Sequence, residues 1–96
     1  MTKATRERNV EDYFVAEVKR VGGEARKVQW VSHNGAPDRF VALNGAHFVE
    51  LKRPKGKPEA HQVREHERLA KNGVPVRVID TFEKVDAFIK EVTCKS

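Results

Sequence analysis

An Asn-Gly pair at positions 44 and 45 constrains the fold more than any other feature of this sequence. Asn-Gly is the strongest short-range signal for a type I′ β-turn, because both residues tolerate a positive φ. The flanking segments, 39–43 and 46–52, contain the aromatic and β-branched residues that are typical of strands. We therefore predict an antiparallel hairpin in which Leu43 pairs with Ala46.

The predicted hairpin brings two carboxylates and a lysine to one place. Pairing about the turn sets Asp38, or its neighbour Arg39, beside the Glu50-Leu51 pair. Side chains alternate along a strand, so Glu50 and Lys52 share a face. Two converging carboxylates repel each other unless a cation compensates, and Mg²⁺ typically binds one or two carboxylates and keeps several waters. A lysine beside such a site can stabilise charge on a phosphate.

Periodicity along the rest of the chain predicts a single α/β domain that spans residues 1–96. Val10, Phe14 and Val18 recur at helical spacing in the first segment, and two glycines end that helix. The predicted elements are a helix over about residues 5–21, strands over 27–31, 39–43 and 46–52, a helix over 58–72, a strand over 75–79 and a helix from about 82. The α-β-β-β-α-β-α order favours a central mixed sheet flanked by helices.

Charge, cysteine content and hydropathy limit which partners and which structural features this chain can have. The net charge of +5 favours a polyanionic partner. The single cysteine excludes an internal disulfide and a cysteine-based zinc cluster, and no apolar run reaches the roughly 20 residues of a membrane span. Basic residues crowd after the hairpin and on the next helix, where we expect them to contact nucleic-acid phosphates. They are Arg53, Lys55, Lys57, Arg64 and Arg68.

The residues around the hairpin resemble the motifs of a nuclease family. Gly35-Ala36-Pro37-Asp38 matches a G-x-P-D motif, Val49-Glu50-Leu51-Lys52-Arg53 matches an E-L-K-R motif, and Gln62 follows in the next helix. On these motifs the chain resembles, over about residues 6–90, the VRR-NUC domains of the PD-(D/E)xK nuclease superfamily. The resemblance implies a restriction-endonuclease-like core and a phosphodiesterase that depends on Mg²⁺ or Mn²⁺.

The resemblance also implies a role for each residue of the hairpin site. Asp38, Glu50 and the backbone carbonyl of Leu51 would ligate the metal ion. Lys52 would be the catalytic lysine.

Two further site residues, Glu11 and Gln62, are implied on the helices. Glu11 would act at the metal, directly or through a water, and it borders the apolar stripe of the first helix. Glu7, one turn earlier, is the alternative. Gln62 would lie close to the metal; it borders a buried face one turn before His66, which we do not predict as a site residue. Ordinary surface positions remain the alternative for Glu11 and Gln62.

These features predict a metal-dependent, structure-selective DNA endonuclease. A basic rim contacts backbone rather than base edges, which favours branched DNA such as four-way junctions in DNA repair. A homodimer would place one site on each of two DNA strands. We expect the first helix or the region of Trp30 to form the contact between the two copies. Trp30 itself is predicted to pack in the core. The alternatives are a flap or nicking nuclease, a non-catalytic nucleic-acid-binding domain and a protein-interaction module. We expect the cytoplasm of a bacterium or phage-infected cell as its location, with no membrane partner.

Overall fold

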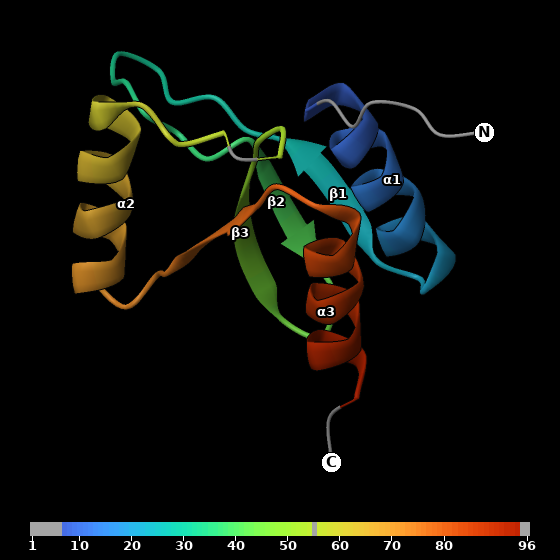
Figure 1. The fold of residues 1–96 in the computed structure, drawn as a ribbon. Helices are drawn as coiled ribbons and strands as arrows, with labels where there is room; N and C mark the ends of the chain where they lie inside the picture. Colours follow the sequence, from blue (N-terminus) through green and yellow to red (C-terminus); the bar gives the residue numbers. More distant parts are fainter. Residues whose placement is uncertain (1–6, 55, 95–96) are drawn as a thin grey trace.

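The computed structural model describes residues 7–54 and 56–94, and it confirms the predicted order of helices and strands (Figure 1). The elements are α1 (Glu7–Arg20), β1 (Glu24–Lys27), β2 (Arg39–Ala42), β3 (Ala46–Leu51), α2 (Ala60–Lys71), β4 (Val76–Ile79) and α3 (Phe82–Thr93). Within the described residues, no helix has the length and hydropathy needed to span a membrane.

The four strands form one mixed sheet in the order β1-β2-β3-β4. β2 pairs antiparallel with β1 and with β3, whereas β3 and β4 are parallel. Parallel neighbours need a crossover connection, and α2 lies within this one. α1 and α3 pack together on one face of the sheet, and α2 lies on the other side (Figure 1). The predicted mixed sheet flanked by helices is therefore confirmed.

The apolar core fills the space between the sheet and the α1–α3 pair. Val49 and Leu51 of β3 are fully buried in this core, and Glu50 between them faces the other side because side chains alternate along a strand. Burial of each such apolar side chain contributes about 1.5–3 kcal/mol. The core consists of Val10, Phe14, Val18, Val41, Leu43, Val49, Leu51, Ile79, Val85, Phe88, Ile89 and Val92. The buried residue of α2 is Glu65, so α2 contributes a carboxylate rather than apolar side chains to the interior.

The turn of the hairpin contains one residue more than predicted. Ala42, rather than Leu43, pairs with Ala46, so that three residues form the loop. Asn44 in this loop has a φ of 50°, and the glycine after it has a φ of 126°. The side-chain amide of Asn44 also donates a hydrogen bond of 2.7 Å to the carbonyl of Val92 in α3. The predicted Leu43–Ala46 pair is therefore wrong by one residue, and the wider turn contacts a helix that is distant in the sequence.

This register decides which side chains share a face of the sheet. Arg39 pairs with Val49, and extension of the register by one residue sets Asp38 opposite Glu50. Residues directly opposite one another in an antiparallel pair lie on the same face. In the predicted register, Asp38 would have stood opposite Leu51, whose side chain points into the core. The additional turn residue therefore brings the two carboxylates to one face.

The strand predicted over residues 27–31 is wrong. β1 ends at Lys27, and residues 28–38 form a loop that runs to α2 (Figure 1). The indole Nε1 of Trp30 donates a hydrogen bond of 2.6 Å to the Glu65 carboxylate of α2. Trp30 is half-buried by this contact and is not part of the apolar core in which we expected it. A tertiary contact thus outweighs the strand propensity of the segment.

The 28–38 loop touches the backbone of α2 at Gly35. The φ of Gly35 is 94°, and a Cβ atom there would lie 2.8 Å from the carbonyl oxygen of His61 and 2.9 Å from Cβ of Glu65. Gly73, which follows α2, has a similar φ of 89° but no atom near the position of its absent Cβ. The two glycines share a backbone conformation and differ in their surroundings.

Gly35→Ala should therefore destabilise the protein more than Gly73→Ala. Both substitutions force an alanine to a positive φ, at a cost of about 1–2 kcal/mol. Gly35→Ala also forces a clash with α2, which should add about 1–3 kcal/mol to the loss. Urea denaturation of the wild type and both variants measures the difference. Equal losses in the two variants would contradict close packing of the loop on α2.

Candidate active site

The predicted carboxylates converge where β2 begins and β3 ends. Asp38 immediately precedes β2, Glu50 and Leu51 end β3, and Lys52 follows. Oδ2 of Asp38 accepts a hydrogen bond of 2.8 Å from the backbone N–H of Leu51. The Asp38 side chain therefore closes the open end of the hairpin and is held in place by the strand that carries Glu50.

Glu50 is fully buried, and this burial dominates its electrostatics. Burial first, and the negative charge of Asp38 second, raise the pKa of Glu50 to about 7, although Lys52 acts in the opposite direction. Burial likewise raises the pKa of Asp38 above its usual value. The surroundings make both carboxylates costly to ionise, and a bound cation would relieve that cost.

Two side chains hold one oxygen of Glu50, and the other oxygen is buried. Nε2 of Gln62 donates a hydrogen bond of 2.7 Å to Oε2 of Glu50, and Nζ of Lys52 lies 3.2 Å from the same oxygen. Oε1 of Gln62 accepts a hydrogen bond of 2.7 Å from the N–H of Glu59, the N-cap of α2, which fixes the orientation of the amide. Oε1 of Glu50 has no hydrogen-bond partner in the described part of the chain.

His66, which we did not predict as a site residue, also lies at this site. Its Nε2 lies 3.8 Å from Oε1 of Glu50. Burial first, and the charge of Lys52 second, lower the pKa of His66, which keeps the imidazole neutral at pH 7. The signal was its spacing: His66 follows Gln62 by four residues and so lies on the same face of α2.

The arrangement fits a divalent cation that prefers oxygen ligands. Glu50 offers a buried oxygen without a hydrogen-bond partner among the described residues, and Asp38 adds a second carboxylate. Across residues 7–54 and 56–94, no three His, Cys, Asp or Glu side chains gather as a metal-binding group. Mg²⁺ needs fewer protein ligands, because it usually keeps several waters. The carbonyl of Leu51 as a further ligand stays a prediction.

Glu11 lies at the edge of the site, where it is paired with Arg39. Its Oε2 accepts a hydrogen bond of 3.0 Å from Nε of Arg39, and Nη2 of Arg39 lies 3.0 Å from the same oxygen. The negative charge of Glu11 also contributes to the raised pKa of Asp38. Glu11 is therefore close enough to influence the carboxylates, and its action on a metal stays a prediction.

The predicted phosphate-binding side chains lie on the exposed surface around the hairpin and α2. The exposed members are Arg53, Lys57, Arg64 and Arg68. Lys55 lies outside the described residues. Contact of these side chains with a nucleic acid stays a prediction.

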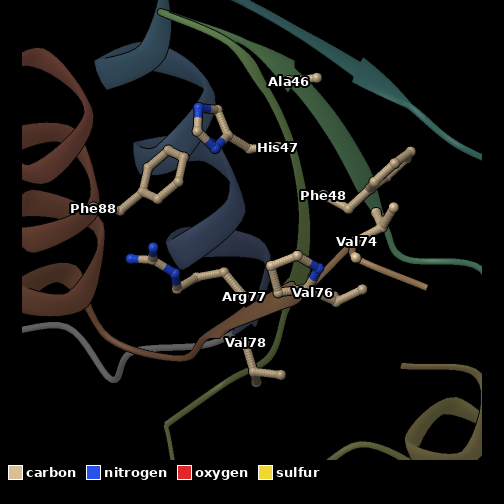
Figure 2. Close-up of a pocket in the computed structure, with 10 residues that line it drawn as sticks. Ala46, His47, Phe48, Val74, Val76, Arg77, Val78 and Phe88 are labelled. Carbon is tan, nitrogen blue, oxygen red and sulfur yellow. The ribbon is translucent and has the colours of Figure 1, made fainter. Parts of the chain in front are cut away.

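A separate pocket lies along β3 and β4 and does not include the carboxylates. His47, Arg77 and Phe88 lie on one side of it, and Phe48 and Val76 lie on the other (Figure 2). The Arg77 guanidinium stands 5.3 Å from the centroid of the Phe88 ring. No Asp or Glu is among the described residues that line this pocket, so it does not compete as a metal site.

Comparisons with known proteins find relatives that match most of the chain, although no family model matches it. The chain is 46% identical over 78 residues to the "Putative nuclease p44" of Acyrthosiphon pisum secondary endosymbiont phage 1, a match that covers 79% of this chain and 84% of that protein. A solved structure described as a VRR_NUC domain is 40% identical, with a TM-score of 0.80 and coverage of 91% of this chain and 97% of the other.

Glu50→Gln should stabilise the metal-free protein most strongly at alkaline pH. The pKa of Glu50 is raised from 4.5 to about 7, so between these values the folded protein binds a proton that the unfolded chain has lost. The contribution of Glu50 to stability therefore falls as pH rises through this window. Above it, the ionised carboxylate costs on the order of 3 kcal/mol, which a neutral glutamine avoids.

Urea denaturation in EDTA at pH 5 and pH 8 measures this effect. The gain of Glu50→Gln over wild type should be larger at pH 8. Glu67→Gln, at an exposed position of α2, is the matched control and should change stability little at either pH. A gain for Glu50→Gln that does not depend on pH would show that ionisation of Glu50 is not its origin.

Proposed function

The chain belongs to the VRR_NUC family of nucleases, and on that premise we propose that it is a metal-dependent, structure-selective DNA endonuclease. The observation that carries the proposal is the buried Glu50 carboxylate beside Asp38. Its pKa is raised to about 7, and its Oε1 has no hydrogen-bond partner among the described residues. A buried carboxylate that is costly to ionise and has one oxygen without such a partner suits a divalent cation, and Mg²⁺ or Mn²⁺ is the expected ion.

The proposed reaction is hydrolysis of a phosphodiester. The oxygen of a water forms a bond to phosphorus, the bond from phosphorus to a sugar oxygen breaks, and the leaving oxygen takes up a proton. A bound divalent ion supplies Lewis acidity at the phosphoryl oxygens and lowers the pKa of water. Asp38 and Glu50 would hold the ion, and Lys52 would stabilise the negative charge that develops on the phosphoryl oxygens.

Gln62 and His66 act on Glu50 rather than on the substrate. Gln62 occupies Oε2 of Glu50 by its hydrogen bond of 2.7 Å, so that Oε1 is the oxygen left for the cation. The side chain of His66 is only 13% exposed, and its Nε2 lies 3.8 Å from Oε1 on the side of α2. Because its lowered pKa keeps the imidazole neutral, His66 does not oppose a cation by charge.

The substrate that fits best is branched DNA. The exposed basic side chains can bind phosphates, which carry no base identity, so selectivity would come from the shape of the DNA. A four-way junction is the favoured form, and a homodimer with two-fold symmetry would place one site on each of two strands. A flap or nicking nuclease is the nearest alternative, and a non-catalytic nucleic-acid-binding domain is the other.

Lys52→Ala should lower the rate of DNA cleavage by about 10²–10³-fold, because it removes one electrostatic stabiliser of the transition state. Labelled four-way junction, flap, splayed and linear duplex DNA, each with Mg²⁺, Mn²⁺ or EDTA, provide the assay. Lys27→Ala, at an exposed lysine that ends β1, is the matched control and should cleave normally. Wild-type cleavage by Lys52→Ala would remove the lysine from the mechanism, whereas binding without cleavage by every protein would favour the non-catalytic alternative.

Asp38→Asn should weaken the binding of Mn²⁺ by roughly 10-fold or more, because it removes one of two anionic ligands. Isothermal titration calorimetry without DNA measures the affinity directly. The hydrogen bond from the Leu51 N–H can be kept by the amide oxygen, so the hairpin should stay closed. Asp12→Asn, at an exposed carboxylate of α1, is the control. Unchanged affinity in Asp38→Asn would exclude Asp38 as a ligand.

A further inference from the structure

One carboxylate clamps both ends of a tight turn in the 28–38 loop. Oε2 of Glu65 accepts a hydrogen bond of 2.6 Å from Nε1 of Trp30, and Oε1 lies 3.0 Å from Nε2 of His33. Trp30 and His33 are the first and last residues of the turn, and Ser32 between them has a φ of 61°. A single side chain of α2 therefore fixes the entry and the exit of this turn.

The clamp itself is firmly held. Nη2 of Arg68 lies 2.9 Å from Oε1 of Glu65, whose side chain is only 8% exposed. Burial alone would raise the pKa of Glu65, but the hydrogen bonds from His33, Arg68 and Trp30 outweigh it and lower the pKa, so that the carboxylate stays ionised. The Trp30 ring also meets the Phe48 ring edge-on, with 6.2 Å between centroids. The turn is thus pre-organised rather than loose.

The clamped turn presents an apolar side chain to solvent. Val31, directly after Trp30, is 91% exposed. A single exposed apolar residue is common on protein surfaces and by itself indicates nothing. Here, however, the residue stands at the tip of a rigid turn, and the same carboxylate that holds the turn also holds Arg68. The exposed side chain of Val31 therefore lies on a turn that is connected, through Glu65, to the positively charged Arg68 of α2.

Exposed basic residues form a stripe along α2 beside the turn. Arg64, Arg68 and Lys71 are separated by four and three residues, which places them on one side of the helix. Arg68 joins the stripe to the turn through Glu65, and more than half of its side chain stays exposed. Glu65 contacts both Arg68 and the two ends of the turn, so a phosphate bound at Arg68 would lie near the turn.

We propose that Val31 is a wedge that enters an open base step of branched DNA while the α2 stripe binds the adjacent phosphates. The inference rests on the proposed nuclease function and adds the element that recognises the branch. Apolar wedges between base steps are a known means of opening a duplex, and they require a few kcal/mol of unstacking per step. That cost is smallest where bases are already unpaired. A rigid wedge therefore favours branched DNA over linear duplex.

The test compares DNA binding by the Lys52→Ala protein, which should not cleave, with binding by the same protein that also carries Val31→Ser. A four-way junction and a linear duplex of the same sequence carry 2-aminopurine, a base analogue whose fluorescence rises on unstacking, at the branch point or the matching position. Val31→Ser should weaken junction binding by about 10-fold, leave duplex binding unchanged and abolish the fluorescence rise. Val31→Leu, which keeps an apolar side chain, should restore both signals.

Val63→Ser is the matched control, because Val63 is also exposed on α2 but lies off the basic stripe. It should bind both DNAs like the parent protein. Equal losses of junction and duplex binding in Val31→Ser, or unchanged junction binding and fluorescence, would overturn the wedge. Absence of DNA binding by every protein, including the parent, would instead overturn the nuclease function on which the wedge rests.

Discussion

A carboxylate enclosed at the end of β3 is the interaction on which the arrangement of this protein depends. Glu50 has no exposed surface and is costly to ionise, with a pKa raised to about 7. The fold tolerates it because Gln62 and Lys52 reach one of its oxygens, and Asp38 closes the hairpin alongside. Local conflicts of this kind are expected where function, rather than stability, sets the structure.

The helix that serves this carboxylate is attached by polar contacts. α1 and α3 share an apolar core with the sheet, whereas α2 adds no residue to that core and reaches the rest of the molecule through hydrogen bonds and close contacts of Gln62, Glu65 and His66. Apolar packing is not directional, but hydrogen bonds have defined distances and angles. The register of α2 on the sheet is therefore set by the site and the 28–38 loop, and one helix couples the two.

Local signals explain why most of the fold and much of the site could be predicted. The alternation along residues 46–52 places Glu50 and Lys52 together, and helical spacing places Gln62 near a buried face. The features that could not be predicted depend on contacts between distant segments. Asn44 forms a hydrogen bond with α3, and the register of its hairpin differs by one residue from the expected register. Trp30 forms a hydrogen bond with Glu65, although the propensity of its segment favours a strand. Neither partner is visible in the local sequence.

The alternation of β3 has a consequence for how such a protein can diverge. Val49 and Leu51 belong to the core, while Phe48 and Glu50 belong to the opposite face that carries the site. Alternate residues of β3 therefore contribute to different properties: the odd-numbered ones pack in the core, and the even-numbered ones face the candidate site. A substitution on the even-numbered face can therefore change the candidate site while the odd-numbered residues keep the core packed.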